Sequence, residues 1–186
     1  MSRRNTLSAH LALLRGINVG GKNLLPMKDL TQIFLEAGCS GVRTYIQSGN
    51  VIFSASPRLL SSVSGRITAG ISDRFGYQIP VVLRTAEQLA EAIANNPFVN
   101  TGADQKMLHV LFLADEPTSQ SIGKLDPDRS PPDAFVVRSR EVYLHLPNGA
   151  ARTKLTNSYF DTRLATVSTG RNWATVLKLL ELMQAP

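Results

Sequence analysis

Apolar residues are spaced in two ways along the first half of the chain. One spacing is typical of strands and the other is typical of helices. Short apolar runs bounded by turn residues indicate strands, and apolar residues spaced by three and four positions indicate helices. The expected strands cover 8–15, 42–46, 51–54 and 79–83, and the expected helices cover 27–37, 57–75 and 86–94. Up to residue 83 the order is β-α-β-β-α-β, which is the order of a ferredoxin-like fold. Pro80 places the last of these strands at a sheet edge, because proline cannot donate to the ladder.

The second half repeats this order of elements without a visible repeat of residues. Strands are expected over 107–114, 134–138 and 142–146 with a short segment at 167–169, and helices after Pro117, over 157–164 and over about 172–183. The last helix is expected to bury Trp173, Val176, Leu177 and Leu180 on one face. We therefore predict an α+β protein with a ferredoxin-like subdomain over 1–95, packed as one compact unit on a second, related α+β subdomain over 96–186.

Composition narrows the class of protein. The chain is 43% hydrophobic and 18% charged, which is enough apolar material for a core. Its apolar runs are shorter than the ~18 residues of a membrane span. The single cysteine, Cys39, excludes an internal disulfide framework and favours a reducing compartment. The sequence thus predicts a cytoplasmic protein with no membrane partner.

The charge is basic and unevenly distributed. The formal net charge is +6, with 10 Lys and Arg against 5 Asp and Glu in residues 1–95, and 10 against 9 in residues 96–186. Between Arg138 and Lys178 seven bases accompany only Glu141 and Asp161. This distribution permits a polyanionic partner without requiring one, since ordinary surface charge would also account for it.

A glycine-rich stretch follows the first expected strand and resembles a phosphate-binding P-loop. From Gly16 it has four intervening residues, then Gly21-Lys22, but Asn23 stands where a P-loop has Ser or Thr. Pro26 delays the next helix, so that its first amides cannot face the loop. The hairpin-rich element order also differs from the parallel sheet of P-loop proteins. The stretch is therefore better interpreted as a glycine-rich loop that is not a P-loop.

Four blocks of sequence carry a family resemblance that spans nearly the whole chain. They are RGINVGGKNLLPM at 15–27, RTYIQSGNVIF at 43–53, LPNGAARTKLTNSYF at 146–160 and GRNWATVLKLLEL at 170–182. Together they resemble the bacterial domain-of-unknown-function family 1697. The resemblance implies an α+β fold with a ferredoxin-like N-terminal part and no established activity. In the third block, Ala150 and Ala151 depart from the Gly-x-Gly-like turn that the family would place there.

The topology predicts where an anion would bind. In a β-α-β-β-α-β sheet the loop after the first strand and the turn between the second and third strands lie at the same end. The predicted binding residues there are Arg15, Asn18, Gly20, Gly21, Lys22, Asn23, Gln47, Ser48 and Asn50. Their amides, side-chain donors and positive charges suit a phosphate or a nucleic-acid backbone. The alternative is structural: the glycines supply positive φ, and the asparagines bond to their own loops.

A second anion-contacting element is predicted in the last third of the chain. It consists of the basic loop of Arg152 and Lys154 together with Arg171 and Asn172, which we expect at the start of the last helix. The alternative is that these are solvated charges and a helix cap. The histidines lie within apolar strands and have no metal-ligand spacing, so no metal or cofactor is expected.

Three classes of function stay open from the sequence. The first is a protein that binds a phosphate-bearing ligand or nucleic acid through the glycine-rich loop and the Gln47–Asn50 turn. The second is an enzyme acting on a phosphorylated small molecule or nucleotide in a cleft between the subdomains. The third is a protein-interaction module without a small ligand. Neither a catalytic residue nor an oligomeric state is predicted.

Overall fold

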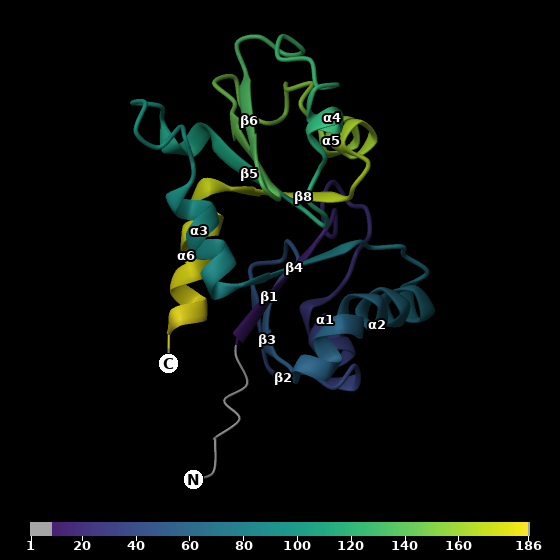
Figure 1. Ribbon diagram of the computed structural model, residues 1–186. Helices are drawn as coiled ribbons and strands as arrows, with labels where there is room; N and C mark the ends of the chain where they lie inside the picture. The colour runs from purple at the N-terminus through teal and green to yellow at the C-terminus, as the bar shows by residue number, and fades with distance from the viewer. Residues whose placement is uncertain (1–8, 186) are drawn as a thin grey trace. The chain divides into compact units, whose positions relative to one another are not determined.

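A computed structural model describes residues 9–185 (Figure 1). The first expected strand begins at Ala9 among these residues, and Ser8 lies outside them. Within the described part of the chain, no helix has the length and apolar character needed to cross a membrane.

The first sheet has the ferredoxin-like topology that the sequence predicts. Its elements are β1 (Ala9–Leu14), α1 (Met27–Glu36), β2 (Ser40–Tyr45), β3 (Asn50–Ser54), α2 (Pro57–Phe75) and β4 (Val81–Thr85). The strand order is β2-β3-β1-β4, and each neighbouring pair is antiparallel. As Pro80 indicated, β4 is an edge strand. The loop after β1 and the β2–β3 turn therefore lie at one end of the sheet.

Local sequence signals set the ends of the helices. Ser56 precedes α2, and its Oγ accepts the Leu59 N–H at 3.3 Å, while Pro57 occupies the first turn. Gly76 ends α2 in the left-handed region, with φ of +74°. In α1 the residue before the first turn is Pro26, whose extended backbone delays the helix until Met27.

Helices α1 and α2 cover one face of the first sheet (Figure 1). Leu30, Ile33 and Phe34 of α1 are buried, and so are Val63, Ile67 and Ile71 of α2. Leu11 and Leu13 point to the opposite face because side chains alternate along β1. Both are fully buried as well.

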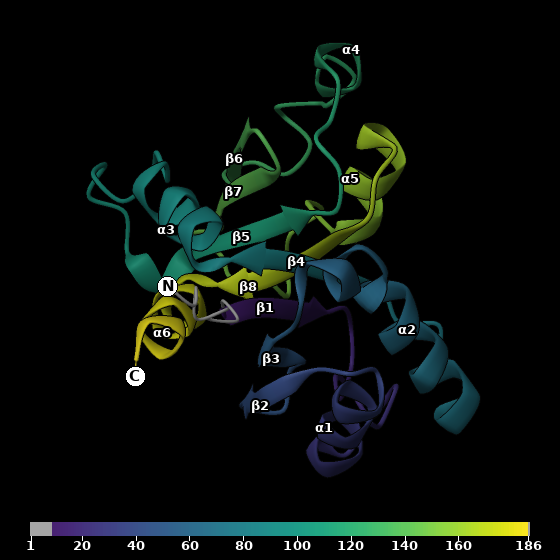
Figure 2. The ribbon, with the colours of Figure 1, turned by 60° about the horizontal axis from the view of Figure 1, so that its bottom comes forward.

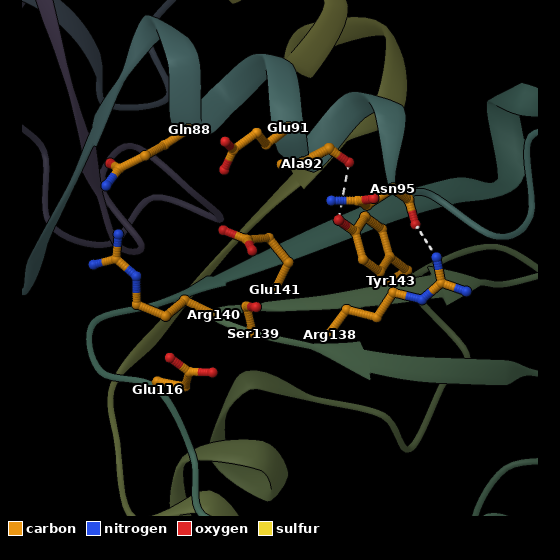
Figure 3. Close-up of a pocket in the computed structure, with 10 residues that line it drawn as sticks. All are labelled: Gln88, Glu91, Ala92, Asn95, Glu116, Arg138, Ser139, Arg140, Glu141 and Tyr143. Carbon is orange, nitrogen blue, oxygen red and sulfur yellow. Dashed lines mark hydrogen bonds between the residues drawn. The ribbon is translucent and has the colours of Figure 1, made fainter.

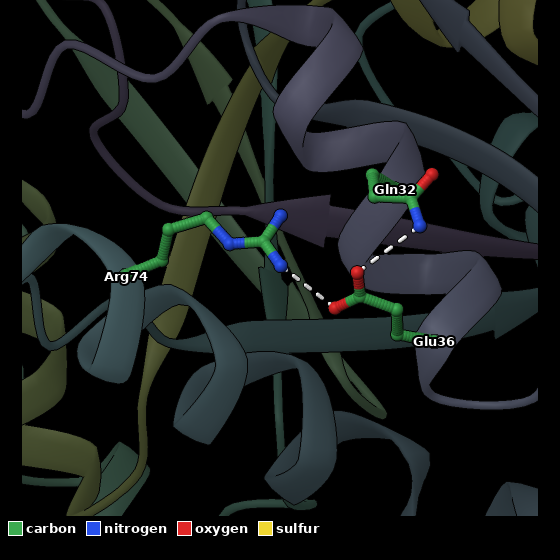
Figure 4. A network of polar contacts seen from close by, with 3 residues as sticks. All are labelled: Gln32, Glu36 and Arg74. Carbon is green, nitrogen blue, oxygen red and sulfur yellow. Dashed lines mark hydrogen bonds and ion pairs between the residues drawn. The ribbon is translucent and has the colours of Figure 1, made fainter.

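A polar contact on the surface joins the two helices of this layer (Figure 4). Glu36 of α1 accepts a 2.8 Å hydrogen bond from Arg74 of α2 and a 3.0 Å hydrogen bond from Gln32 one helical turn earlier. These two donors, Gln32 first, lower the pKa of Glu36 below its ordinary value. The Glu36 side chain is half exposed, so the contact contributes little to stability.

The second sheet repeats the connectivity of the first. Its elements are β5 (Leu108–Leu113), α4 (Ser119–Ile122), β6 (Ala134–Arg138), β7 (Glu141–His145), α5 (Asn157–Leu164) and β8 (Ser168–Asn172). The order β6-β7-β5-β8 corresponds strand by strand to β2-β3-β1-β4. Even one backbone bond recurs: Leu14 N–H donates to the Gly49 carbonyl, and Leu113 N–H donates to the Arg140 carbonyl, both at 2.8 Å.

The two faces of the second sheet have different helices. On one face, Tyr159, Phe160 and Leu164 of α5 pack with Leu111 and the other inward residues of the strands. Figure 2 shows α5 alongside β8. On the other face, α3 (Ala86–Ala94) is tied to β7 by a 2.9 Å hydrogen bond from the Tyr143 hydroxyl to the Ala92 carbonyl.

The last helix, α6 (Trp173–Gln184), corrects one detail of the sequence analysis. Trp173, Val176 and Leu179 are buried, whereas Leu177 is 40% exposed. The buried face therefore runs through Leu179 and not through Leu177, because three residues from Val176 complete nearly one turn.

By its internal contacts the chain forms two compact units. The first contains the residues up to Ala86 and those from Met183, and the second contains Glu87–Leu182. Helix α3 lies in the second unit, except for its first residue. The expected domain boundary after residue 95 stays a prediction.

Candidate functional site

The glycine-rich loop, residues 16–25, is a small hairpin-like turn in the structure. Lys22 N–H donates to the Val19 carbonyl at 3.0 Å across Gly20 and Gly21. These glycines have φ of +57° and +73°, as a type I′ turn requires. The glycines that resemble a P-loop in sequence therefore supply the geometry of a tight turn.

The topology argument places the loop beside the β2–β3 turn, and the structure shows the contact. The Asn18 side-chain Nδ2 donates to the Gln47 carbonyl at 2.9 Å and to the Leu25 carbonyl at 2.9 Å. Its Oδ1 accepts the Leu25 N–H at 2.8 Å. Asn18 is thus a three-bond clasp that closes the loop and fixes it to the turn.

The other asparagines of this predicted site also bond within the loops. Asn23 Nδ2 donates to the Gly16 carbonyl at 3.0 Å. Asn50 is fully buried, and its Nδ2 donates to Ser48 Oγ at 2.9 Å and to the Tyr45 carbonyl at 3.2 Å. These contacts favour the structural interpretation of the asparagines. Lys22, which is exposed, stays the most direct candidate for an anion contact at this end of the sheet.

The second unit contains a better-formed concavity, which we call the α5 pocket. It has a volume of about 290 Å³ and lies at the start of α5, between the 150–157 segment and strands β5, β7 and β8. Its lining residues are His109, Leu111, Leu144, Leu146, Ala150, Thr153, Leu155, Thr156, Asn157, Gly170, Arg171 and Asn172. Leucines form one wall and polar groups form the rim, which is the usual composition of a small-molecule pocket. Among these described lining residues there is no carboxylate.

His109 is the most informative residue of the α5 pocket. The imidazole interacts with the Met107 backbone, and its buried Nδ1 forms no well-aligned hydrogen bond among the described residues. Buried polar atoms are nearly always paired, so the surroundings of this nitrogen are unusual. Burial also lowers the pKa of the His109 imidazole, which keeps it neutral at pH 7. A neutral imidazole offers one donor and one acceptor.

The start of α5 supplies further donors to the same pocket. Thr156 caps the helix by accepting the Tyr159 N–H on its Oγ1 at 3.2 Å. The amides of Asn157 and Ser158 precede the first intrahelical bonds and carry the positive end of the helix dipole. Asn157 is oriented by a 2.8 Å bond from its Nδ2 to Ser168 Oγ. The Asn157 side chain is therefore held by β8, while its backbone belongs to α5.

The basic loop is held in place along its backbone. Lys154 N–H donates to Ser130 Oγ at 3.0 Å, and Arg129 Nε donates to the Lys154 carbonyl at 3.2 Å. The Arg129 guanidinium in turn lies 4.3 Å from the centre of the Tyr159 ring, a cation–π contact. The Arg152 and Lys154 side chains are exposed on either side of Thr153, which lines the pocket.

Arg171 differs from its predicted setting, whereas Asn172 lies at the start of the last helix as predicted. Arg171 is in strand β8, not at a helix start, and its guanidinium donates to Thr169 Oγ1 at 2.9 Å and to the Gly170 carbonyl at 2.7 Å. It is 8% exposed, and burial lowers its pKa to about 10. Asn172 caps α6, since its Oδ1 accepts the Thr175 N–H at 2.8 Å. The strand continues three residues further than its apolar pattern indicated.

The side-chain directions along β8 follow from its register with β5. Arg171 is opposite Val110, and Gly170 is opposite Leu111. Leu111 belongs to the core under α5, so the Arg171 side chain points to the other face. Asn172 is opposite His109 and shares the face of the α5 pocket. Of the two residues, Asn172 is therefore the one whose side chain borders this pocket.

A smaller and more polar pocket lies under α3 (Figure 3). Its volume is about 140 Å³. Glu91 of α3 and Glu141 of β7 point into the same space, and the charged lining also includes Glu116, Arg138 and Arg140. Carboxylates and guanidinium groups are thus mixed in it, which gives no clear preference for the charge of a ligand.

Contacts around this polar pocket explain its structure. Arg138 Nη1 donates to the Asn95 carbonyl at 2.8 Å, and the Tyr143 hydroxyl bonds to the Ala92 carbonyl as described above. Both bonds fasten α3 to the hairpin of β6 and β7. The described residues contain no group of three or more His, Cys, Asp or Glu that could hold a metal ion.

Arg152, Lys154 and Asn172, which the sequence predicts as anion contacts, lie in or next to segments that line the α5 pocket, whereas His109 was not predicted. Because side chains alternate along β5, the sequence predicts that His109 shares a face with Leu111. The cavity could not be predicted, because it is formed by a loop that folds back over the sheet.

The comparisons with known proteins agree with the fold and leave the activity open. Residues 7–143 match the model of the family described as "Protein of unknown function (DUF1697)". A conserved bacterial protein of Streptococcus pneumoniae, SP0830, has a similar structure, with a TM-score of 0.68 and 20% sequence identity. The alignment covers 96% of this chain and 99% of that one. No curated protein matches the sequence.

Proposed function

The chain belongs to the DUF1697 family of proteins of unknown function, and on that premise we propose that it binds a small phosphate-bearing ligand in the α5 pocket. The observation that carries this proposal is a cavity at the start of α5 that has His109 in its wall and contains no carboxylate among its described lining residues.

The charge and size of the pocket support an anionic ligand of limited size. Arg152 and Lys154 are exposed on either side of Thr153, a lining residue, and the amides at the start of α5 favour negative charge. A volume of about 290 Å³ is at the small end of ligand pockets. It fits a phosphomonoester with a compact apolar body against the leucine wall better than it fits a dinucleotide.

The glycine-rich loop is the second place at which a phosphate or a nucleic-acid backbone could bind. Lys22 and the exposed Gly20–Gly21 turn supply charge and backbone donors there. Asn18, Asn23 and Asn50 are engaged within the loops, so this place offers fewer groups for a ligand. The two places lie on different units and can be separated by mutation.

Thermal unfolding with added ligands tests the proposal. Inorganic phosphate, sugar phosphates, nucleoside monophosphates and short RNA are each added to the wild type and to Lys154→Ala, Lys22→Ala and Lys124→Ala. A ligand at 100 times its Kd stabilises the folded state by about 2.7 kcal/mol. We expect a phosphomonoester to raise the melting temperature of the wild type and of Lys22→Ala, and to lose most of this effect in Lys154→Ala.

Lys124→Ala is the matched control, because it removes the same charge from an exposed position of the same unit that does not line the pocket. His109→Phe is the second probe, since it keeps a ring in the pocket wall and removes both imidazole nitrogens. If Lys22→Ala alone removes the ligand effect, the site is the glycine-rich loop. If no phosphate compound raises the melting temperature, the protein does not bind this ligand class.

A further inference from the structure

Three large aliphatic side chains are exposed at one end of the first sheet. Val19 is 62% exposed, Leu24 is 59% exposed and Ile46 is 51% exposed. Val19 and Leu24 belong to the glycine-rich loop, and Ile46 begins the β2–β3 turn. The bond from Asn18 Nδ2 to the Gln47 carbonyl holds the two segments together. We call these three residues the aliphatic edge.

Ile46 has an unfavourable backbone conformation in addition to its exposure. Its φ is +49°, in the left-handed region, where Cβ of an ordinary residue crowds the backbone. Glycine and asparagine adopt this region with less strain, and a β-branched residue there is an outlier. The side chain is half in solvent, so core packing does not account for it. Strained residues of this kind concentrate at functional sites.

The two sequence segments that form the aliphatic edge carry only basic charges. Residues 15–25 and 40–50 contain Arg15, Lys22 and Arg43 and no Asp or Glu. A second copy of the chain docked edge to edge would bring these like charges together, which disfavours a symmetric dimer through this surface. The partner that complements the edge is anionic and accepts aliphatic side chains.

We propose that the aliphatic edge docks on an anionic lipid membrane surface, with Val19, Leu24 and Ile46 inserted among the acyl chains. Lys22 and Arg43 then lie at the level of the headgroups, where each basic residue adds attraction to acidic lipid. A bilayer accommodates separate side chains that project from two turns, whereas a protein partner would need a matching groove. This proposal revises the expectation from the sequence that the protein has no membrane partner.

The proposal concerns a surface association and does not depend on the α5 pocket. The aliphatic residues supply the apolar contact, and the cations supply the preference for acidic lipid, as in other interfacial proteins. Both contributions are needed, so neutral vesicles should bind much less protein than anionic ones. Binding should also weaken as the salt concentration rises, because the headgroup attraction is screened.

Vesicle co-sedimentation tests the proposal. The probes are vesicles of phosphatidylcholine alone and vesicles with roughly one-third phosphatidylglycerol. The variants are Ile46→Asn and Leu24→Ser, which keep the charge, and the control is Leu35→Ser, which removes an aliphatic side chain that is 46% exposed on α1. We expect each edge variant to weaken binding to anionic vesicles by about ten-fold or more, and Leu35→Ser to bind like the wild type.

Ile46→Asn carries a second readout, because relief of backbone strain should leave the melting temperature unchanged or higher. If Ile46→Asn loses vesicle binding but keeps its melting temperature, the loss is due to the changed surface and not to unfolding. Equal binding of all variants would mean that basic charge alone attracts the vesicles, and would overturn the proposal. So would binding to neutral vesicles as strong as to anionic ones, or no vesicle binding at all, which would turn attention to an acidic protein partner.

Discussion

The side-chain amide of Asn18 donates to the Gln47 carbonyl at 2.9 Å, across 29 positions of sequence. This bond joins the glycine-rich loop to the β2–β3 turn. The same side chain also bonds to both the N–H and the carbonyl of Leu25, a residue that is 1% exposed. Asn18 therefore has a structural role, although the stretch that contains it resembles a P-loop in sequence.

Replacement of Asn18 should destabilise the fold strongly. Asn18→Ala removes three hydrogen bonds and leaves the buried Leu25 N–H without its acceptor. We expect a loss of about 2–4 kcal/mol in the free energy of unfolding, measured by urea denaturation. Asn148→Ala, at an exposed turn position, is the control and should change stability by about 0.5 kcal/mol or less. If Asn18→Ala has the same free energy of unfolding as the wild type, the three hydrogen bonds of Asn18 do not stabilise the fold.

Two glycines at the same end of the sheet provide a matched comparison. Both have positive φ, +77° for Gly49 and +73° for Gly21. A Cβ on Gly49 would lie 2.8 Å from Leu14 Cβ and 3.1 Å from Ile17 Cγ1, whereas a Cβ on Gly21 would have no atom within 4 Å. The two alanine variants therefore separate backbone strain from steric overlap.

We expect Gly21→Ala to cost about 1–2 kcal/mol from backbone strain. Gly49→Ala should cost a further ~1–3 kcal/mol, because well-packed neighbours must move. Chemical denaturation of both variants measures the difference. Equal losses would show that the loop relaxes around the new methyl group.

The thiol of Cys39 should be unreactive in the folded protein. Cys39 is 5% exposed, and burial raises its pKa to about 11. At pH 8 the thiolate fraction is then on the order of one in a thousand, and the reagent must also reach it. We expect a thiol reagent to modify the native protein at the rate of local or global unfolding, and to modify it rapidly in urea. Fast modification without denaturant would place Cys39 at an accessible position.

Acid should weaken the contact between α1 and α2. The pKa of Glu36 is lowered in the folded state by its bonds from Gln32 and Arg74. Its contribution is therefore complete above the unfolded pKa, near 4.5, and is lost as the pH falls through the lower folded pKa. Glu36→Gln should remove this part of the acid dependence.

The measurement is the midpoint of urea unfolding between neutral pH and pH 3, for the wild type and for Glu36→Gln. We expect the two proteins to differ most at neutral pH and to converge in acid. Because the carboxylate is exposed, added salt should reduce the difference. A difference that grows as the pH falls would contradict this role for Glu36.

Most of the fold follows from local pattern. The span of α2 is visible in the Ser56-Pro57 start and the Gly76 stop. Even the joining of the two loops was predictable, because strands of a β-α-β-β-α-β sheet have fixed directions. These features depend on interactions between residues that are close in sequence or on rules of chain connection.

The sequence by itself determined the α+β class, the ferredoxin-like order of the first half, its echo in the second half, and the edge position of β4. Only the tertiary structure decided what the polar residues do. Asn18 could bind an anion or clasp a loop, and its hydrogen bonds with Leu25 and Gln47 show the clasp. His109 could be an ordinary strand residue, and its setting in the α5 pocket makes it a candidate ligand contact. The physical reason is that apolar patterns reflect burial, which is repeated along an element, whereas the role of one polar side chain depends on the few atoms that folding brings to it.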